Sequence, residues 1–129
     1  MRNLLLIALL LGGAADAANT MRIDYVHSGN RDIEMFSLDQ VVIEGLPFPG
    51  NLHQPLDTSL RGKYLFEIRD PATGDVAWSR SFSSIYGEWE TTGEARRINR
   101  SFHESVRFPA PESTFSMMPW SLLTAGRSP

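Results

Sequence analysis

Cysteine is absent from the 129-residue chain, and histidine occurs only at His27, His53 and His103. Without cysteine the chain has no disulfide, no thiolate zinc site, no thiol nucleophile and no lipidated lipoprotein N-terminus. Metal or base chemistry would have to rest on three histidines that are far apart in the sequence. These absences leave few of the common catalytic constellations open.

An excess of basic charge is also missing, since 12 Lys and Arg stand against 15 Asp and Glu, for a formal charge of −3. Nucleic acids and anionic membranes are usually bound through a basic patch. The composition therefore predicts one globular domain without a nucleic-acid partner.

Long apolar runs are rare, and the clearest is Leu4–Leu11. It follows the cationic start Met1-Arg2 and precedes Ala15 and Ala17, which suit the −3 and −1 positions of a signal-peptide cleavage site. Eight helical residues cover about 12 Å, whereas a membrane span needs about 20 residues. We predict that residues 1–17 are a signal peptide, that the protein is secreted or periplasmic, and that no membrane span remains after cleavage.

Period-two alternation predicts strands in the first half of the chain. Met21, Ile23 and Tyr25 fall on one face of a strand, and residues 27–30 are predicted to turn the chain. Between Ile33 and Ile43 the apolar phase slips, and each slip would flip the buried face of a regular strand. This segment is predicted as two short strands or one bulged strand.

A β-hairpin is the clearest local signal. Tyr64, Phe66 and Ile68 alternate with polar residues, residues 70–75 contain Pro and Gly in a turn, and residues 76–79 lead out. The preceding residues, 45–62, are predicted to form a long loop, which is either a contact surface or an ordered excursion over the end of a sheet.

The second half of the chain is predicted to contain a short helix and a last strand. Residues 91–94 resemble a capping box, and Ala95, Ile98 and Phe102 recur at helical spacing. A strand over residues 104–108 should end at Pro109. Residues 113–129 hold a single charge, Arg127, and we predict a divergent, disordered tail there.

Catalytic patterns are incomplete. His103-Glu104 begins like a zinc-peptidase helix, but Arg107 stands where the second histidine is required. Neither serine of the pair at 83 and 84 lies in a nucleophile elbow, and we predict both to be turn or strand serines. Glu88 and Glu90 flank Trp89 as in some glycosidases, but a core tryptophan with solvated neighbours is the better interpretation. We assign no catalytic residue and no metal ligand.

Several segments together resemble a known family. The segments are Thr20–Tyr25, His27–Asn30, Phe36–Asp39, Gly62–Phe66, Ser79–Trp89, Thr91–Thr92, Glu94–Ala95 and Phe102–Arg107. In this order, over about residues 19 to 112, they resemble the N-terminal domain of the bacterial IgA-peptidase family of zinc metallopeptidases, family sixty-four. The resemblance implies an antiparallel β-sandwich with one short helix over residues 18–112, in a secreted or periplasmic enzyme common in Bacteroidetes.

The resemblance also implies that zinc and the catalytic residues belong to a separate peptidase domain, which is the expected partner. No residue here matches the His-Glu-x-x-His motif, so we expect no cofactor on this chain. The charge-poor tail begins where the last strands of the sandwich are expected. The chain is therefore expected to be a truncated or frameshifted member with an incomplete C-terminus.

Three function classes follow from these observations. The first is a non-catalytic accessory domain that orients a protein or glycoprotein substrate. The second is a free-standing secreted module that binds glycan or glycoprotein, with Tyr86, Trp89, Phe48 and His53 as the candidate binding surface. The third, an enzyme in its own right, has the least support.

Overall fold

The computed structural model describes residues 18–70, 73–110 and 123–127. In this part of the chain strands predominate. In chain order the elements are β1 (Asn19–Gly29), β2 (Glu34–Pro47), β3 (Tyr64–Arg69), β4 (Val76–Phe82), α1 (Ile85–Trp89), the 3-10 turn η1 (Glu94–Arg96), β5 (Arg100–Pro109) and β6 (Leu123–Arg127).

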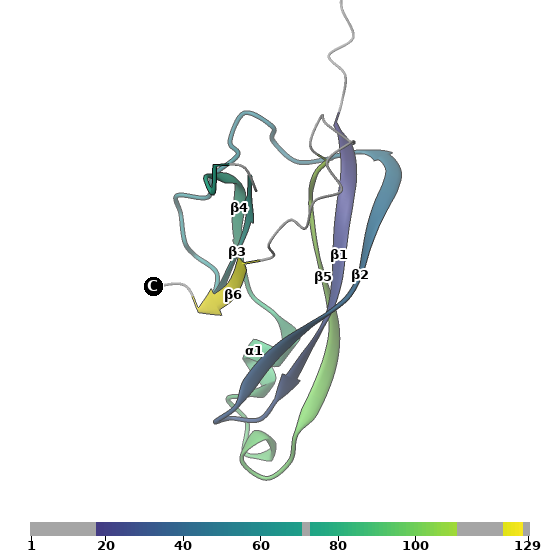
Figure 1. The fold of residues 1–129 in the computed structure, drawn as a ribbon. Helices are drawn as coiled ribbons and strands as arrows, with labels where there is room; N and C mark the ends of the chain where they lie inside the picture. The colour runs from purple at the N-terminus through teal and green to yellow at the C-terminus, as the bar shows by residue number, and fades with distance from the viewer. Residues whose placement is uncertain (1–17, 71–72, 111–122, 128–129) are drawn as a thin grey trace, which may run out of the picture.

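The strands form two antiparallel sheets that face each other (Figure 1). Sheet A has the order β2-β1-β5, and sheet B has the order β4-β3-β6. Sheet A is the longer layer, and α1 lies against its lower half in the view of Figure 1. The predicted mainly β, antiparallel fold with one short helix is thereby confirmed.

The core lies between the two sheets because each strand presents alternate residues inward. Sheet A contributes Ile23 and Tyr25 of β1 with Val106 and Phe108 of β5, and sheet B contributes Phe66, Ile68 and Trp78. A smaller cluster of Tyr86, Trp89 and Ala95, with Phe102 packed on it, joins α1 to β5. The predicted inward phase of Ile23 and Tyr25 is confirmed.

Strand β2 is a single bulged strand, which decides between the two predicted alternatives. Asp24 pairs with Gln40 and Tyr25 with Leu38, so Asp39 is the extra residue. This bulge keeps Phe36 and Leu38 on the same side of sheet A as Val41 and Ile43, because one inserted residue cancels one slip of phase.

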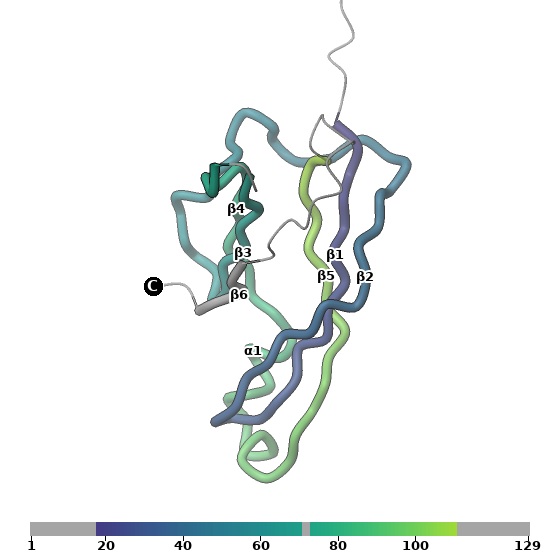
Figure 2. The backbone as a smooth tube through the Cα atoms, viewed as in Figure 1, coloured from purple at the N-terminus to yellow at the C-terminus, as the bar shows by residue number. Residues whose placement is uncertain are grey.

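The hairpin β3–β4 is confirmed, and its turn is closed by backbone bonds between Asp70 and Asp75 and between Gly74 and Asp70. Gly74 has a φ of 77°, a value that glycine adopts without strain. The loop before β3 is ordered along the outer edge of β4 (Figure 2). Pro55 accepts a bond from the backbone of Ser79, and Asp57 accepts bonds from the backbone and hydroxyl of Ser81. This loop therefore covers an edge that would otherwise be open.

The predicted helix position was wrong. Residues 94–96 form only a 3-10 turn, and Phe102 lies in β5. The α-helix instead begins directly after Ser84, whose hydroxyl accepts a hydrogen bond from Gly87 N at 3.1 Å and caps the helix. Ser84 is thus a helix cap and not the turn or strand serine that was expected.

Two other expectations differ from the structure. The turn predicted to start at His27 begins later, because β1 continues to Gly29. Gly29 has a φ of 137°, and a Cβ there would lie 2.0 Å from the carbonyl oxygen of Ile33.

The segment predicted as a disordered tail contains β6, while residues 113–122 and 128–129 lie outside the described residues. The domain boundaries stay a prediction.

Candidate functional site

Among the His, Lys, Arg, Asp and Glu residues of the described chain, His27 is the most deeply buried. It lies in β1 in the same inward phase as Ile23 and Tyr25, and its side chain has no exposed surface. The imidazole is stacked between the rings of Phe36 and Tyr86, with centroids 4.1 and 3.9 Å away. Because aromatic rings cover both of its faces, the histidine can form polar contacts only in the plane of its ring.

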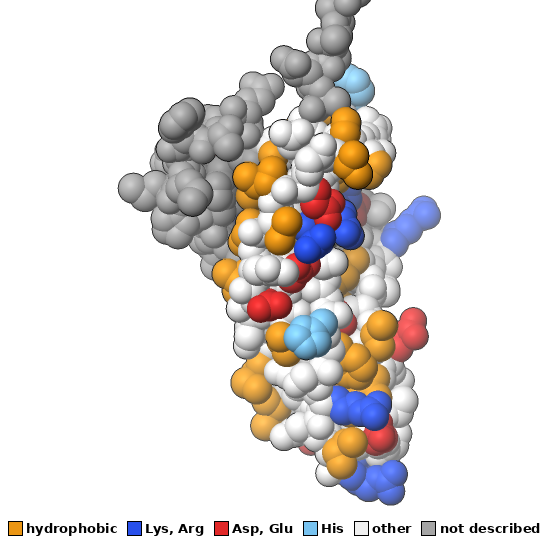
Figure 3. Space-filling model, turned by 90° about the vertical axis from the view of Figure 1, so that its right-hand side faces the viewer, with side chains coloured by type: hydrophobic (Ala, Val, Ile, Leu, Met, Phe, Trp, Pro, Cys, Tyr) orange, Lys and Arg blue, Asp and Glu red, His pale blue; other side chains and the backbone are white. Residues whose placement is uncertain are grey.

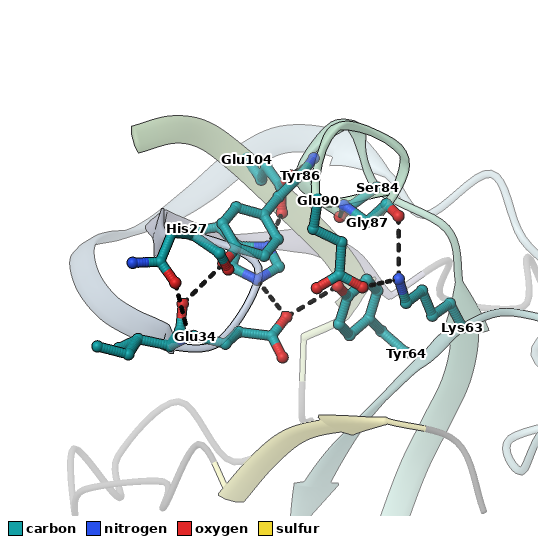
Figure 4. Close-up of polar contacts among 11 residues, drawn as sticks. His27, Glu34, Lys63, Tyr64, Ser84, Tyr86, Gly87, Glu90 and Glu104 are labelled. Atoms are coloured by element: carbon teal, nitrogen blue, oxygen red, sulfur yellow. Dashed lines mark hydrogen bonds and ion pairs between the residues drawn. The ribbon is translucent and has the colours of Figure 1, made fainter. Parts of the chain in front are cut away.

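Both ring nitrogens of His27 meet carboxylates (Figure 4). The Nδ1 atom lies 2.9 Å from Glu104 Oε2, and the Nε2 atom lies 2.8 Å from Glu34 Oε1. Each ring nitrogen therefore has a glutamate oxygen within hydrogen-bonding distance, and the ring is held in its plane between two glutamates.

The two glutamates are held by further contacts. Glu34 Oε1 accepts a bond from the Tyr64 hydroxyl at 2.8 Å, which links sheet A to sheet B. Glu104 Oε1 accepts a bond from the backbone nitrogen of Tyr86 at 3.3 Å. Burial raises the pKa of Glu104, but its hydrogen bonds with His27 and Tyr86 outweigh that effect and hold this pKa below its ordinary value.

Tyr86 closes the site from α1. Its side chain is fully buried, and its hydroxyl lies 2.7 Å from the carbonyl oxygen of Asn30 and 2.9 Å from that of Ile33. These carbonyls belong to the turn between β1 and β2. One tyrosine therefore joins the helix to that turn and covers one face of His27.

A second buried polar contact, between Lys63 and Glu90, lies near the His27 cluster. Lys63 forms an ion pair with Glu90 and donates to the carbonyl oxygen of Gly87 at 2.9 Å. Glu90 is only 6% exposed. This pair connects the start of β3 to the end of α1, so the helix is bound to both sheets through charged groups.

The arrangement suits a structural role better than catalysis. A general base or metal ligand needs an accessible nitrogen with a free lone pair, whereas both nitrogens of His27 are engaged and the ring has no exposed surface. In the ranges that the structure describes, no group of three or more His, Asp or Glu residues is placed to hold a metal ion. The described residues therefore do not fit a zinc site.

The candidate binding residues from the sequence are not gathered on one surface. Tyr86 and Trp89 are core side chains, with exposed fractions of 0% and 8%, so the structure removes them from that surface. Phe48 packs edge-on against Trp78, with ring centroids 5.2 Å apart. His53 is exposed in the ordered loop.

The remaining candidates are placed as follows. Glu88 is exposed, whereas Glu90 is buried against Lys63, so only one neighbour of Trp89 is solvated. His103 is exposed on β5. Ala15 and Ala17, predicted for signal cleavage, lie outside the described residues.

Sequence reasoning missed the His27 cluster, although period-two alternation contained the signal. His27 is in phase with Tyr25, Glu34 with Phe36, and Glu104 with Val106, so each polar residue occupies an inward position of its strand. A polar residue in the buried phase of a strand needs a partner. The alternation could therefore have marked these three residues as buried polar groups in need of partners, although it does not say which strands are neighbours.

The fold and the enclosed ion triad of His27, Glu34 and Glu104 define a class: a β-sandwich domain braced by buried polar side chains. The chain matches the family described as Peptidase M64 N-terminus over residues 14–118. The chain belongs to this family, which is the N-terminal, non-catalytic part of a metallopeptidase family. No match to the chain was found among the curated proteins.

No helix in the described ranges is both long enough and apolar enough to cross a membrane.

Proposed function

We propose that the chain is a non-catalytic accessory domain of a secreted zinc metallopeptidase that resembles IgA peptidase. Membership of the Peptidase M64 N-terminus family is the observation that carries this proposal, because an N-terminal domain of a peptidase family implies association with a catalytic domain. In this proposal the zinc and the water-activating residue belong to that catalytic domain, and this chain binds or orients the substrate beside it.

The described geometry supports an accessory role. The best candidate for acid–base chemistry, His27, is shielded on both faces and bonded at both nitrogens. Its effect is to fix β1, β2, β5 and α1 relative to one another. A rigid sandwich is suited to holding a partner or a substrate segment in a constant orientation.

The proposal is tested with the purified full chain by measuring bound zinc and cleavage of casein. We expect no stoichiometric zinc and no cleavage above background. Reproducible zinc-dependent cleavage that Glu104→Gln abolishes, while circular dichroism shows that this variant is still folded, would overturn the accessory role.

The alternative, a free-standing glycan-binding module, has less support because Tyr86 and Trp89 are buried. It would need the exposed loop around His53 as its contact surface. A glycan array with the full chain separates the two ideas: saturable binding lost in His53→Ala, without any association with a peptidase domain, would favour the module.

A further inference from the structure

A row of apolar side chains on β2 faces the core side of sheet A, and in the described part of the chain these side chains are largely exposed. Leu38, Val41 and Ile43 pair with Tyr25, Ile23 and Met21 of β1. The β1 partners Ile23 and Tyr25 are each 5% exposed, whereas Leu38, Val41 and Ile43 are 60%, 51% and 57% exposed. We call these three β2 residues the open row.

The open row is exposed because the second layer of the sandwich does not reach it. The buried core cluster takes its members from β1, β3, β4 and β5, and β2 adds only Phe36, which is partly buried. The bulge at Asp39 nevertheless keeps the open row turned toward the core side. Exposed apolar groups of this kind commonly mark interaction sites.

The backbone of β2 adds to this surface. Strand β2 is 14 residues long and is an edge strand of sheet A, so in the described part of the chain its backbone is paired only with β1. The outer edge of β4, by contrast, is covered by the ordered loop. A long edge strand with exposed apolar side chains is a typical place for a partner strand to pair, which favours a partner at β2.

The charges of β2 limit what that partner can be. The strand carries Glu34, Asp39 and Glu44 and no basic residue. Glu34 is paired with His27, and Glu44 with Arg22 and Arg107, which leaves Asp39 without an ion-pair partner among the residues described. On the face drawn in Figure 3, acidic and basic side chains lie next to each other, with hydrophobic side chains near them. A second copy of this chain, paired through its own β2, would offer no basic side chain from that strand to meet Asp39.

We propose that the open row docks an apolar, extended segment of the peptidase domain, with a basic side chain opposite Asp39. This inference rests on the proposed function, because it identifies the surface through which the accessory domain meets its catalytic partner. The contact would cover Leu38, Val41 and Ile43 and extend sheet A beyond β2.

The test measures binding of the full chain to the peptidase domain of a full-length family member, produced separately, by titration calorimetry. The variant Leu38→Asp/Val41→Asp should weaken binding by at least about tenfold, because it buries carboxylates against apolar surface. The matched control is Met35→Asp, since Met35 is 55% exposed on the same strand but pairs with Ser28 on the opposite face. The control should bind like the wild type, and circular dichroism checks that all variants are folded.

The possible results separate the docking surface from the association with a peptidase domain. If the wild type binds and the double variant binds equally well, or if Met35→Asp is equally damaging, the docking surface is wrong and the accessory association stands. If the wild type does not bind at all, both the surface and the association are overturned. If light scattering shows a dimer that Leu38→Asp/Val41→Asp dissociates, the occupant is a second copy and this proposal fails.

Discussion

Glu104→Ala should be among the most destabilising single changes in the domain. It removes one carboxylate from His27, whose side chain is fully buried, and Glu104 itself is only 8% exposed. Breaking a buried ion pair from one side costs about 3–5 kcal/mol, because it leaves an uncompensated charge. Glu34 stays in contact with His27, so we expect a loss near the lower end, about 3 kcal/mol. Domains of this kind have a total unfolding free energy of about 5–15 kcal/mol.

The measurement is urea unfolding of the full chain followed by tryptophan fluorescence. With a denaturant slope of about 1–3 kcal/mol/M, a loss of about 3 kcal/mol lowers the midpoint by about 1–3 M. His103→Ala is the control, because His103 is the exposed neighbour on the same strand and should change stability by no more than about 0.5 kcal/mol. If Glu104→Ala and His103→Ala unfold at the same urea concentration, the ion triad does not stabilise the fold.

Three further predictions concern acid, a glycine and the loop. The pKa of Glu104 is lower in the folded chain than its ordinary value of 4.5, so the stabilisation by Glu104 is complete above pH 4.5 and is lost as the pH falls through the folded pKa. The urea midpoint should therefore fall more steeply in acid for the wild type than for Glu104→Gln. Parallel curves for the two proteins would contradict this. Gly29→Ala should lower the free energy of unfolding by about 1–3 kcal/mol, because Gly29 has a positive φ and an added Cβ would meet a backbone oxygen. Gly45 has open space around it, so Gly45→Ala should melt at the same temperature as the wild type. Asp57→Ala removes four hydrogen bonds, two that join the loop to Ser81 of β4 and two to Ser59 within the loop. Limited proteolysis should therefore cut the loop faster than in the wild type. An unchanged cleavage rate would show that other contacts are enough to hold the loop.

Local patterns predicted those parts of the fold in which neighbouring residues decide the structure. The β3–β4 hairpin followed from alternation and a turn with its own chemistry. The phase slips before Ile43 predicted two short strands or one bulged strand, and the structure has the bulged strand. The helix was misplaced because Ile85–Trp89 is short and contains Gly87, a poor helix former, whereas the packing of Tyr86 and Trp89 in the core stabilises it.

The candidate site could not be predicted in the same way because it is assembled across the chain. His27 and Glu104 are joined only after β1 pairs with β5, and no local signal fixes that pairing. Burial of Tyr86 and Trp89 likewise depends on which sheet covers α1. The sequence indicated the residue types but not the strand order that brings them together.

The central position of β1 has a consequence for the order in which the domain can fold. Its pairing with β2 is local, but its pairing with β5 joins residues 20–29 to residues 100–109. Contacts between residues so far apart in the chain form slowly, because a long loop must first be closed. During synthesis a β1–β2 ribbon is made well before β5 exists, and for that interval the imidazole of His27 has only one of its two carboxylates. The completed triad is therefore a late event of folding, and the nascent ribbon has to stay soluble until β5 arrives.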